Sequence, residues 1–349
     1  SSSSSTKKTA SFTTRHSCHV SSSILYANSQ SFLSTGVPSK SVIFNMASKR
    51  AKGESRRGAG KKEDAEDELS DADSPTMPKK KIALGNAEKK MAGQKAQEYF
   101  KTGLALSKKA KSKREYAEAL DAYTMAITLK SSNARYYFAR GNTYRITGEY
   151  KKAILDYSSA IRLDSGTANY YSNRGQSYRK LGKPQVALSD FEAAIALEPS
   201  NASLVFNRGM ALYDCGQYKK AIKDFTTALK DKKLTYRAYY NRGNCYRRLK
   251  SLDKSIDDLS QALNLEPRNP SAHNNLGLSF FENKNYDSAI KCFADSISID
   301  PDNPTFYNNK GLALYHRGDV DEALADLNEA IARDSARSPD PNYYFNRGN

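Results

Sequence analysis

A unit of about 34 residues recurs along most of this chain of 349 residues, a length typical of helix–turn–helix repeats. In the unit from Ala134 to Thr167, small residues fall at positions 8, 20 and 27, and large apolar residues at positions 4, 11, 17 and 24. Within each half these positions lie on one face of a helix. One such hairpin cannot bury its apolar face alone, so neighbouring units must stack. The sequence therefore predicts an all-α fold, a right-handed α-solenoid.

Glycine and proline mark the ends of the helices in each unit. Gly148, at position 15, can adopt the positive φ that a tight turn between two helices requires. Proline at position 32, as in Pro199, Pro267 and Pro301, cannot continue a helix. We therefore expect each second helix to end shortly before the next unit begins.

This pattern resembles the tetratricopeptide repeat (TPR) family over residues 96–349, and the resemblance implies a superhelix whose concave side is lined by the first helix of each unit. Three features of the sequence depart from the standard repeat. The first unit has extra residues at 111–114, the fifth has Lys250 and Ser255 in place of Gly and Ala, and a short insert occupies 338–340. The predicted units are 96–133, 134–167, 168–201, 202–235, 236–269, 270–303 and 304–337, with a partial unit at 341–349.

Residues 1–95 lack a sustained helical period and are mostly Ser, Lys, Ala and Gly. Such a composition cannot offset the entropy lost on ordering, so we expect a disordered tail. Its acid-poor start resembles an organelle transit peptide. The alternatives are a missing true start or translation from Met46. We assign no metal to the cluster His16, Cys18 and His19, and, because no capping element follows the last unit, we expect more sequence beyond Asn349.

Charge alternates in blocks along the second half of this tail. Residues 49–62 are basic, 63–73 are acidic and 78–81 are basic again. Such basic clusters serve as nuclear-import signals or nucleic-acid contacts, and a plain solvated tail is the alternative. Ser70 and Ser74 are candidate phosphorylation sites next to the acidic block. The net charge of +17 favours acidic partners without choosing among them.

Positions 7 and 23 vary together within this chain. A cation stands at position 7 only where an acid stands at position 23, and Leu276 at position 7 occurs with Cys292 at position 23. We therefore predict a structural ion pair between the two helices of most units. The predicted pairs are Arg140–Asp156, Arg174–Asp190, Arg208–Asp224, Arg242–Asp258 and Lys310–Asp326.

Positions 2, 5, 6, 9, 12 and 13 of the first helices should face the groove, and position 6 carries a series of asparagines. An Asn side chain offers two donors and an acceptor, which suits the backbone of an extended peptide. A similar asparagine ladder lines the superhelix of O-GlcNAc transferase, and the resemblance implies the same use here. The alternative is that these amides bond neighbouring helices to each other. The series is Asn173, Asn207, Asn241, Asn275, Asn309 and Asn346.

Cations and aromatic rings surround the asparagines, and Leu278, Phe281, Leu312 and Tyr315 make the far end more apolar. We therefore expect a ligand that is acidic at one end and hydrophobic at the other. Chaperone-binding TPR domains hold a terminal carboxylate with Lys at position 5 and Arg at position 6; neither is present, so this clamp is not matched. The remaining candidate residues are Arg135, Arg145, Arg179, Lys180, Arg237, Arg247, Arg248, Phe138, Phe206 and Tyr240.

The preferred hypothesis is a protein-interaction scaffold that holds an extended, acidic peptide in its groove. We expect no catalytic residue, cofactor or metal, because no nucleophile has a partnered base and no glycine-rich phosphate loop follows a strand. The alternatives are a nucleic-acid or nuclear-complex adaptor, and the substrate-binding arm of a larger enzyme. The four cysteines form no CxxC pair, which indicates a reducing compartment. We expect the cytoplasm, with the nucleus or cilium as alternatives, and no membrane span; the oligomeric state stays open.

Overall fold

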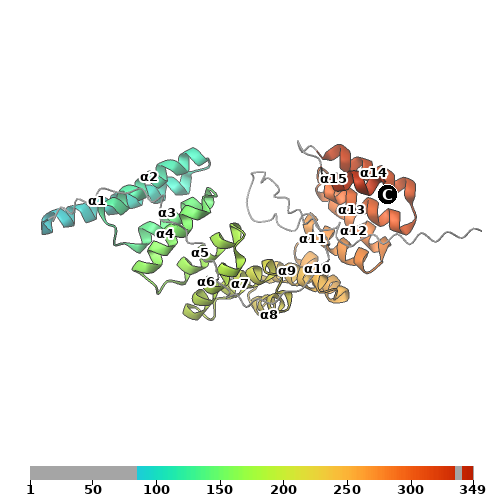
Figure 1. The fold of residues 1–349 in the computed structure, drawn as a ribbon, viewed down its shortest axis with the longest axis horizontal. Helices are drawn as coiled ribbons and strands as arrows, with labels where there is room; N and C mark the ends of the chain where they lie inside the picture. The colour runs from blue at the N-terminus through green and yellow to red at the C-terminus, as the bar shows by residue number, and fades with distance from the viewer. Residues whose placement is uncertain (1–84, 335–339, 349) are drawn as a thin grey trace, which may run out of the picture.

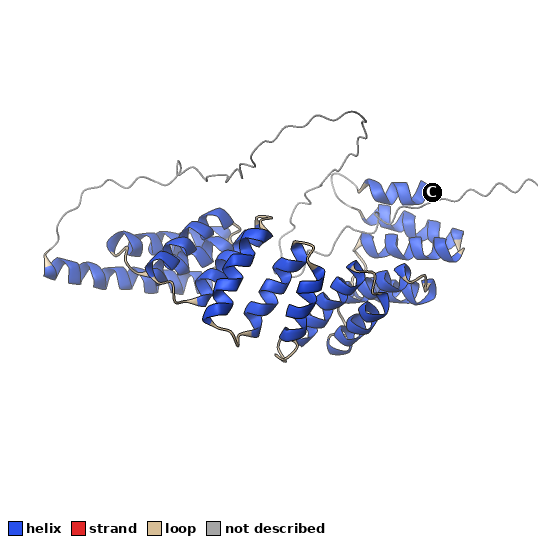
Figure 2. Cartoon of the chain, turned by 60° about the horizontal axis from the view of Figure 1, so that its bottom comes forward, coloured by secondary structure: helices blue, strands red, loops and turns tan. Residues whose placement is uncertain are grey.

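The computed structural model describes residues 85–334 and 340–348, which form helices joined by short turns and contain no strand (Figures 1 and 2). The expected disorder of the tail up to residue 84, the cluster of His16, Cys18 and His19, the charge blocks and the two candidate phosphorylation sites lie outside the described residues. So does most of the insert before the last unit.

Consecutive helices pair as hairpins, and the hairpins follow one another along an arc from α1 to α15 (Figure 1). Each first helix packs against the second helix of its own unit and against that of the unit before. The helices are α1 Asn86–Lys109, α2 Lys113–Leu129, α3 Ala134–Ile146, α4 Tyr150–Leu163, α5 Ala168–Lys180, α6 Pro184–Leu197, α7 Ala202–Asp214, α8 Tyr218–Ala228, α9 Thr235–Arg248, α10 Leu252–Leu265, α11 Pro270–Glu282, α12 Tyr286–Ile299, α13 Pro304–Arg317, α14 Val320–Arg333 and α15 Pro341–Gly348.

First helices lie on the inner side of the arc. Every first helix from α1 to α13 also contacts the next first helix, whereas no two consecutive second helices touch within the described ranges. The chain therefore curves toward its first helices, as the sequence predicted.

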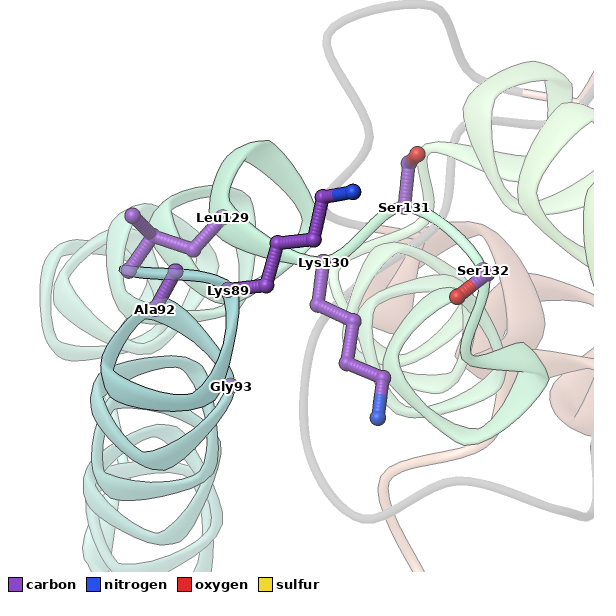
Figure 3. A pocket seen from close by; sticks show the side chains of 7 residues that line it. All are labelled: Lys89, Ala92, Gly93, Leu129, Lys130, Ser131 and Ser132. Carbon is purple, nitrogen blue, oxygen red and sulfur yellow. The ribbon is translucent and has the colours of Figure 1, made fainter. Parts of the chain in front are cut away.

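The first helix begins earlier than expected, at Asn86 instead of Ala96. The Gly85 N–H donates to the Glu88 carboxylate at 2.9 Å, which caps the helix. Residues 86–95 are mostly good helix formers, but their apolar residues do not recur with a helical period. The sequence pattern therefore did not predict this part of the helix, although helix propensity supports it. This extension reaches the α2–α3 turn, where Lys89, Ala92 and Gly93 line an open pocket with residues 129–132 (Figure 3).

Small residues at positions 8 and 20 let the two helices of a unit approach each other closely. Ala153, Ala187 and Ala221, at position 20, are fully buried. At Gly277, an added Cβ would lie only 2.6 Å from the Phe293 ring. The aromatic ring at position 24 thus fills the space that a glycine leaves on the facing helix.

The predicted ion pairs are confirmed. Arg174 donates from Nη2 to Asp190 Oδ1 at 2.7 Å and from Nε to Oδ2 at 3.0 Å, and Asp190 is almost fully buried. Arg174 Nη1 donates to Ser158 Oγ, on the second helix of the preceding unit, at 3.0 Å. One guanidinium therefore joins three helices. The same two-part contact recurs at Arg140, with Asp156 and Thr124, and at Arg242, with Asp258 and Thr226; Arg208–Asp224 and Lys310–Asp326 form the remaining pairs.

Position 15 keeps a positive φ even where glycine is absent. Gly148, Gly182 and Gly216 have φ values of 83°, 73° and 72°, and Lys250 and Lys284 have φ values of 59° and 61°. The geometry of the hairpin, and not the residue type, therefore sets this conformation. In the two lysines the positive φ brings steric strain from the Cβ atom.

Replacing Asp190 with Leu should lower the free energy of unfolding by about 2 to 3 kcal/mol, because a partly buried Arg174 loses its carboxylate. The double variant Arg174→Leu, Asp190→Cys copies the Leu276 and Cys292 pair of the sixth unit. Its free energy of unfolding should fall less than that of Asp190→Leu. Urea unfolding followed by circular dichroism measures both. Equal losses in the single and double variants would contradict a paired charge.

Replacing Lys284 with Gly should raise the free energy of unfolding by about 1 kcal/mol, because glycine adopts this φ without a Cβ clash. Asn283→Gly, one residue earlier at φ −82°, is the matched control and should bring no gain. Thermal unfolding compares the two variants, and an equal rise in both would refute the strain at position 15.

Candidate functional site

The structure places the asparagines of position 6 in two groups. Asn275, Asn309 and Asn346 are buried, with 2%, 5% and 6% of their surface exposed. Each amide donates to the preceding first helix: to Tyr240 Oη at 2.7 Å, to Asn274 Oδ1 at 2.9 Å and to Asn308 Oδ1 at 2.8 Å, respectively. Over this part of the array the asparagines bond helices to each other, so the expectation that they face a ligand is corrected.

The asparagines of the first half are more accessible. Asn173 donates to Asn142 Oδ1 at 2.9 Å, and that oxygen also accepts from Tyr157 Oη at 2.8 Å. Asn241 donates to the backbone oxygen of Arg237 at 2.7 Å. The half-buried amide of Asn207 makes no hydrogen bond to any described residue, so among these side chains it has the most capacity left for a ligand.

Two of the predicted arginines are engaged by carboxylates of the next unit. Arg179 contacts Asp214 at 2.6 Å, and Arg247 contacts Glu282 at 2.9 Å. Burial raises the pKa of Asp214, while the charge of Arg179 opposes that rise. Glu282 also accepts from Lys250 Nζ at 2.8 Å. Because positions 12 and 13 of neighbouring units neutralise each other, the inner face is less basic than the arginines alone suggested.

Two apolar residues expected on the groove are buried instead. Phe206 is 1% exposed and packs against Phe225 with ring centroids 5.4 Å apart, while Arg237 covers its other side at 4.5 Å. Leu278 is 5% exposed. Both side chains pack in the core between helices, because burial of their apolar surface is favourable.

The other predicted residues stay at least partly accessible. Phe138 is half-buried against Tyr157 and Tyr170, and Tyr240 stacks on Tyr236 with centroids 6.0 Å apart. Arg135 and Lys180 are exposed, and Arg145 and Arg248 are half-buried. The most exposed positive charge of the inner face therefore lies on α3 and α5.

A group of polar side chains without full partners surrounds Tyr240 on α7 and α9. Tyr213 Oη, Asn244 Oδ1 and Arg247 Nε are buried and make no hydrogen bond within the described residues. Burial raises the pKa of Tyr240, while interactions with Asn244, Arg247 and Asn275 oppose that rise, and Asn275 Nδ2 donates to its hydroxyl at 2.7 Å. We call Tyr213, Tyr240, Asn244 and Arg247 the central polar cluster. The sequence pattern missed Tyr213 and Asn244, because only their burial without partners distinguishes them.

Aromatic side chains gather at the other end, on α11 to α13. His316 stacks on Tyr286 with centroids 5.7 Å apart and meets Phe281 edge-on at 5.3 Å. Burial lowers the pKa of His316, which favours the neutral ring. Tyr315 beside it is 41% exposed. Aromatic side chains therefore dominate this end of the array.

The described residues contain no group of His, Cys, Asp and Glu side chains that could hold a metal ion. Within those residues no helix combines the length and hydropathy needed to cross a bilayer. The buried thiols have raised pKa values, with that of Cys292 at about 11 because of desolvation, so they are poor nucleophiles.

Two family models match the chain. The model described as "Tetratricopeptide repeat" matches residues 172–223 and 274–339, and the one described as "TPR repeat" matches residues 141–182 and 243–284. Together the matches span 141–223 and 243–339. A search of curated protein sequences returns no significant match.

Solved structures share the fold. A tetratricopeptide repeat protein from Parabacteroides merdae ATCC 43184 aligns with a TM-score of 0.59 and 17% identity, covering 73% of this chain and 98% of that one. PilF from Pseudomonas aeruginosa aligns with a TM-score of 0.52 and 18% identity, covering 62% and 96%. At these identities the likeness establishes the fold alone.

Asn309→Ala should lower the free energy of unfolding by about 1 to 3 kcal/mol, because the buried Asn274 carbonyl would lose its donor. Asn207→Ala, at the same position of another unit, should leave stability within about 0.5 kcal/mol, because its amide has no partner among the described residues. Urea unfolding of the two variants tests this division, which equal losses would rule out.

Proposed function

We propose that this chain, which is a tetratricopeptide repeat protein, acts as a protein-interaction scaffold that binds an extended peptide along its inner face. The observation that carries the proposal is the central polar cluster. Buried polar atoms without partners cost free energy, and native structures keep few of them. These atoms are buried, so a bound peptide would supply the missing partners once the side chains turn toward the inner face.

The chemistry of the cluster suits a peptide backbone. Asn244 Oδ1 can accept from an N–H group, whereas Tyr213 Oη and Arg247 Nε can donate to a carbonyl oxygen. The unbonded amide of Asn207, on the neighbouring α7, can do both. Because every residue of a peptide offers the same backbone groups, such contacts hold an extended segment whatever its side chains are.

The two ends of the inner face would select the side chains of the ligand. Over α3 and α5, Arg135 and Lys180 are exposed and contact no carboxylate among the described residues, so they favour acidic residues. Over α11 and α13, Phe281 and Tyr315 favour apolar ones. The acidic preference rests on the first pair of residues, since Asp214 and Glu282 already engage Arg179 and Arg247.

Peptides selected by the full chain from a random phage-displayed library provide the test. Asn207→Ala combined with Asn244→Ala should weaken binding of every selected peptide about tenfold or more, because each hydrogen bond to the peptide backbone contributes roughly 1 kcal/mol. Fluorescence polarisation measures the affinities. Asn264→Ala, an exposed asparagine on the outer helix α10, is the matched control and should change nothing.

Asn207→Ala alone serves as a second variant, because it removes no hydrogen bond between described residues. Unchanged affinities in both inner-face variants, with the fold intact by circular dichroism, would overturn the proposal. A loss confined to peptides of one sequence class would contradict recognition of the backbone.

A further inference from the structure

Exposed lysines collect at the turns within the first five units, on the edge of the array where each first helix passes to its second helix. Every one of these turns, from α1–α2 to α9–α10, carries at least two of them. We call this set the basic ridge. Its members are Lys108, Lys109, Lys111, Lys113, Lys151, Lys152, Lys180, Lys183, Lys219, Lys220, Lys250 and Lys254.

Few carboxylates offset this charge. Lys152 contacts Glu149 at 2.7 Å and Lys250 contacts Glu282 at 2.8 Å, yet 61% and 57% of the two lysine side chains remain exposed. The side-chain ammonium group of every other ridge lysine lies more than 4.0 Å from the carboxylates of the described part of the chain, although the backbone N–H of Lys111 donates to Glu115. The ridge therefore presents its charge to solvent.

The lysines recur regularly on one edge and over one stretch of the array, whereas on the other edge exposed lysines occur at the α2–α3 turn, with Lys130, and at the α8–α9 turn, with Lys230, Lys232 and Lys233. Turns between units mix both signs, with Asp164, Glu198 and Glu266 beside a few lysines. From α11 onward the turns within units become acidic, with Asp287 opening α12 and Asp321 and Glu322 opening α14. A general excess of lysine would not reverse sign at one unit boundary.

The ridge lysines in the first turns of α4 and α8 occupy positions that the helix dipole does not favour, whereas Lys108, Lys109 and Lys180 lie in last turns, where it does. The N-terminus of a helix carries a partial positive charge, so acidic residues are favoured in the first turn and cations are not. Yet α4 and α8 have lysine pairs in their first turns, Lys151–Lys152 and Lys219–Lys220, and no acidic residue there. By contrast, α12 and α14 have the favoured acids. A lysine that opposes the helix dipole in several units points to a role outside the fold.

We propose that the basic ridge binds the phosphate backbone of a nucleic acid. The ridge follows the curved course of five consecutive units (Figure 1), which suits a long polyanion with regularly spaced charges. It consists of lysines, whose flexible point charges contact phosphates without the fixed geometry that reads bases. A folded protein partner would need aromatic or arginine anchors; beside these lysines, Arg114 is exposed at a single turn, and Tyr150 and Tyr218 are half-buried.

Apart from Lys180, which borders both surfaces, the ridge shares no residue with the inner face, so a peptide and a nucleic acid could occupy the chain together. Several arginines of the array hold ion pairs, as Arg174 and Arg247 do, while most lysines of the ridge contact no carboxylate among the described residues.

The test uses the full chain with duplex DNA and with a homopolymer RNA, each long enough to span the ridge. The ridge variant replaces Lys151, Lys152, Lys219 and Lys220 with Ala. Its affinity for duplex DNA should fall at least about tenfold, and the log–log slope of affinity against salt, between about 50 and 200 mM, should become shallower by up to about 3.6, about 0.9 for each phosphate that is no longer neutralised.

The matched control variant replaces Lys130, Lys230, Lys232 and Lys233, exposed lysines at turns between units, with Ala. It changes the net charge equally and should weaken binding less than about threefold. Equal losses in both variants, or no loss in either, would overturn the proposal, because net charge or the N-terminal tail would then carry the binding.

Three further measurements test the ridge against a structural role and against different polyanions. The melting temperature of the ridge variant should equal or exceed that of the parent, since the lysines oppose the helix dipole; a lower value would assign them a structural role. The ridge variant should keep the affinity for library-selected peptides. Polyglutamate or phosphatidylserine vesicles bound more tightly than either nucleic acid would overturn the proposal in favour of an acidic protein or a membrane.

Discussion

The guanidinium group at position 7 is the contact on which the stacking of units depends most directly. In Arg174 it binds Asp190 within its own unit and Ser158 in the unit before, so one side chain fixes both the hairpin and its neighbour. This geometry requires the helices to lie close together, which the glycine at position 8 and the alanine at position 20 allow. Every contact of this kind reaches only an adjacent unit, so the stability of the array is a sum of local terms.

The sixth unit shows what replaces this contact. Leu276 and Cys292 stand where other units have a cation and an acid, and both are buried in one apolar cluster with Leu259. An apolar pair can substitute for a buried ion pair at little cost because no charge must leave water. The same unit begins the stretch in which the turns within units become acidic, while the ion pair returns in the seventh unit as Lys310–Asp326.

Spacing within a unit made the fold and the ion pairs predictable, because those features depend on contacts that the repeat itself encodes. The inner face was harder to predict. Asn207 and Asn309 occupy one position of the repeat, yet only Asn309 meets an acceptor, Asn274, on the preceding helix. Likewise Arg247 is neutralised by Glu282 of the next unit. Whether an inner-face side chain is paired depends on which residue the neighbouring unit places opposite it, and the pattern within one unit does not contain this information. The start of α1 was missed for a related reason, since no apolar period marks it.

The outer helices of this array do not touch one another within the described ranges, whereas the inner helices do. Contacts between first helices on the inner side therefore resist bending more than the outer side does. A small rotation at each joint between units adds up over the length of the array, so its pitch can tighten or relax without breaking any hairpin. Under tension the arc would lengthen first by such rotations, and only at higher force would the hairpins themselves come apart.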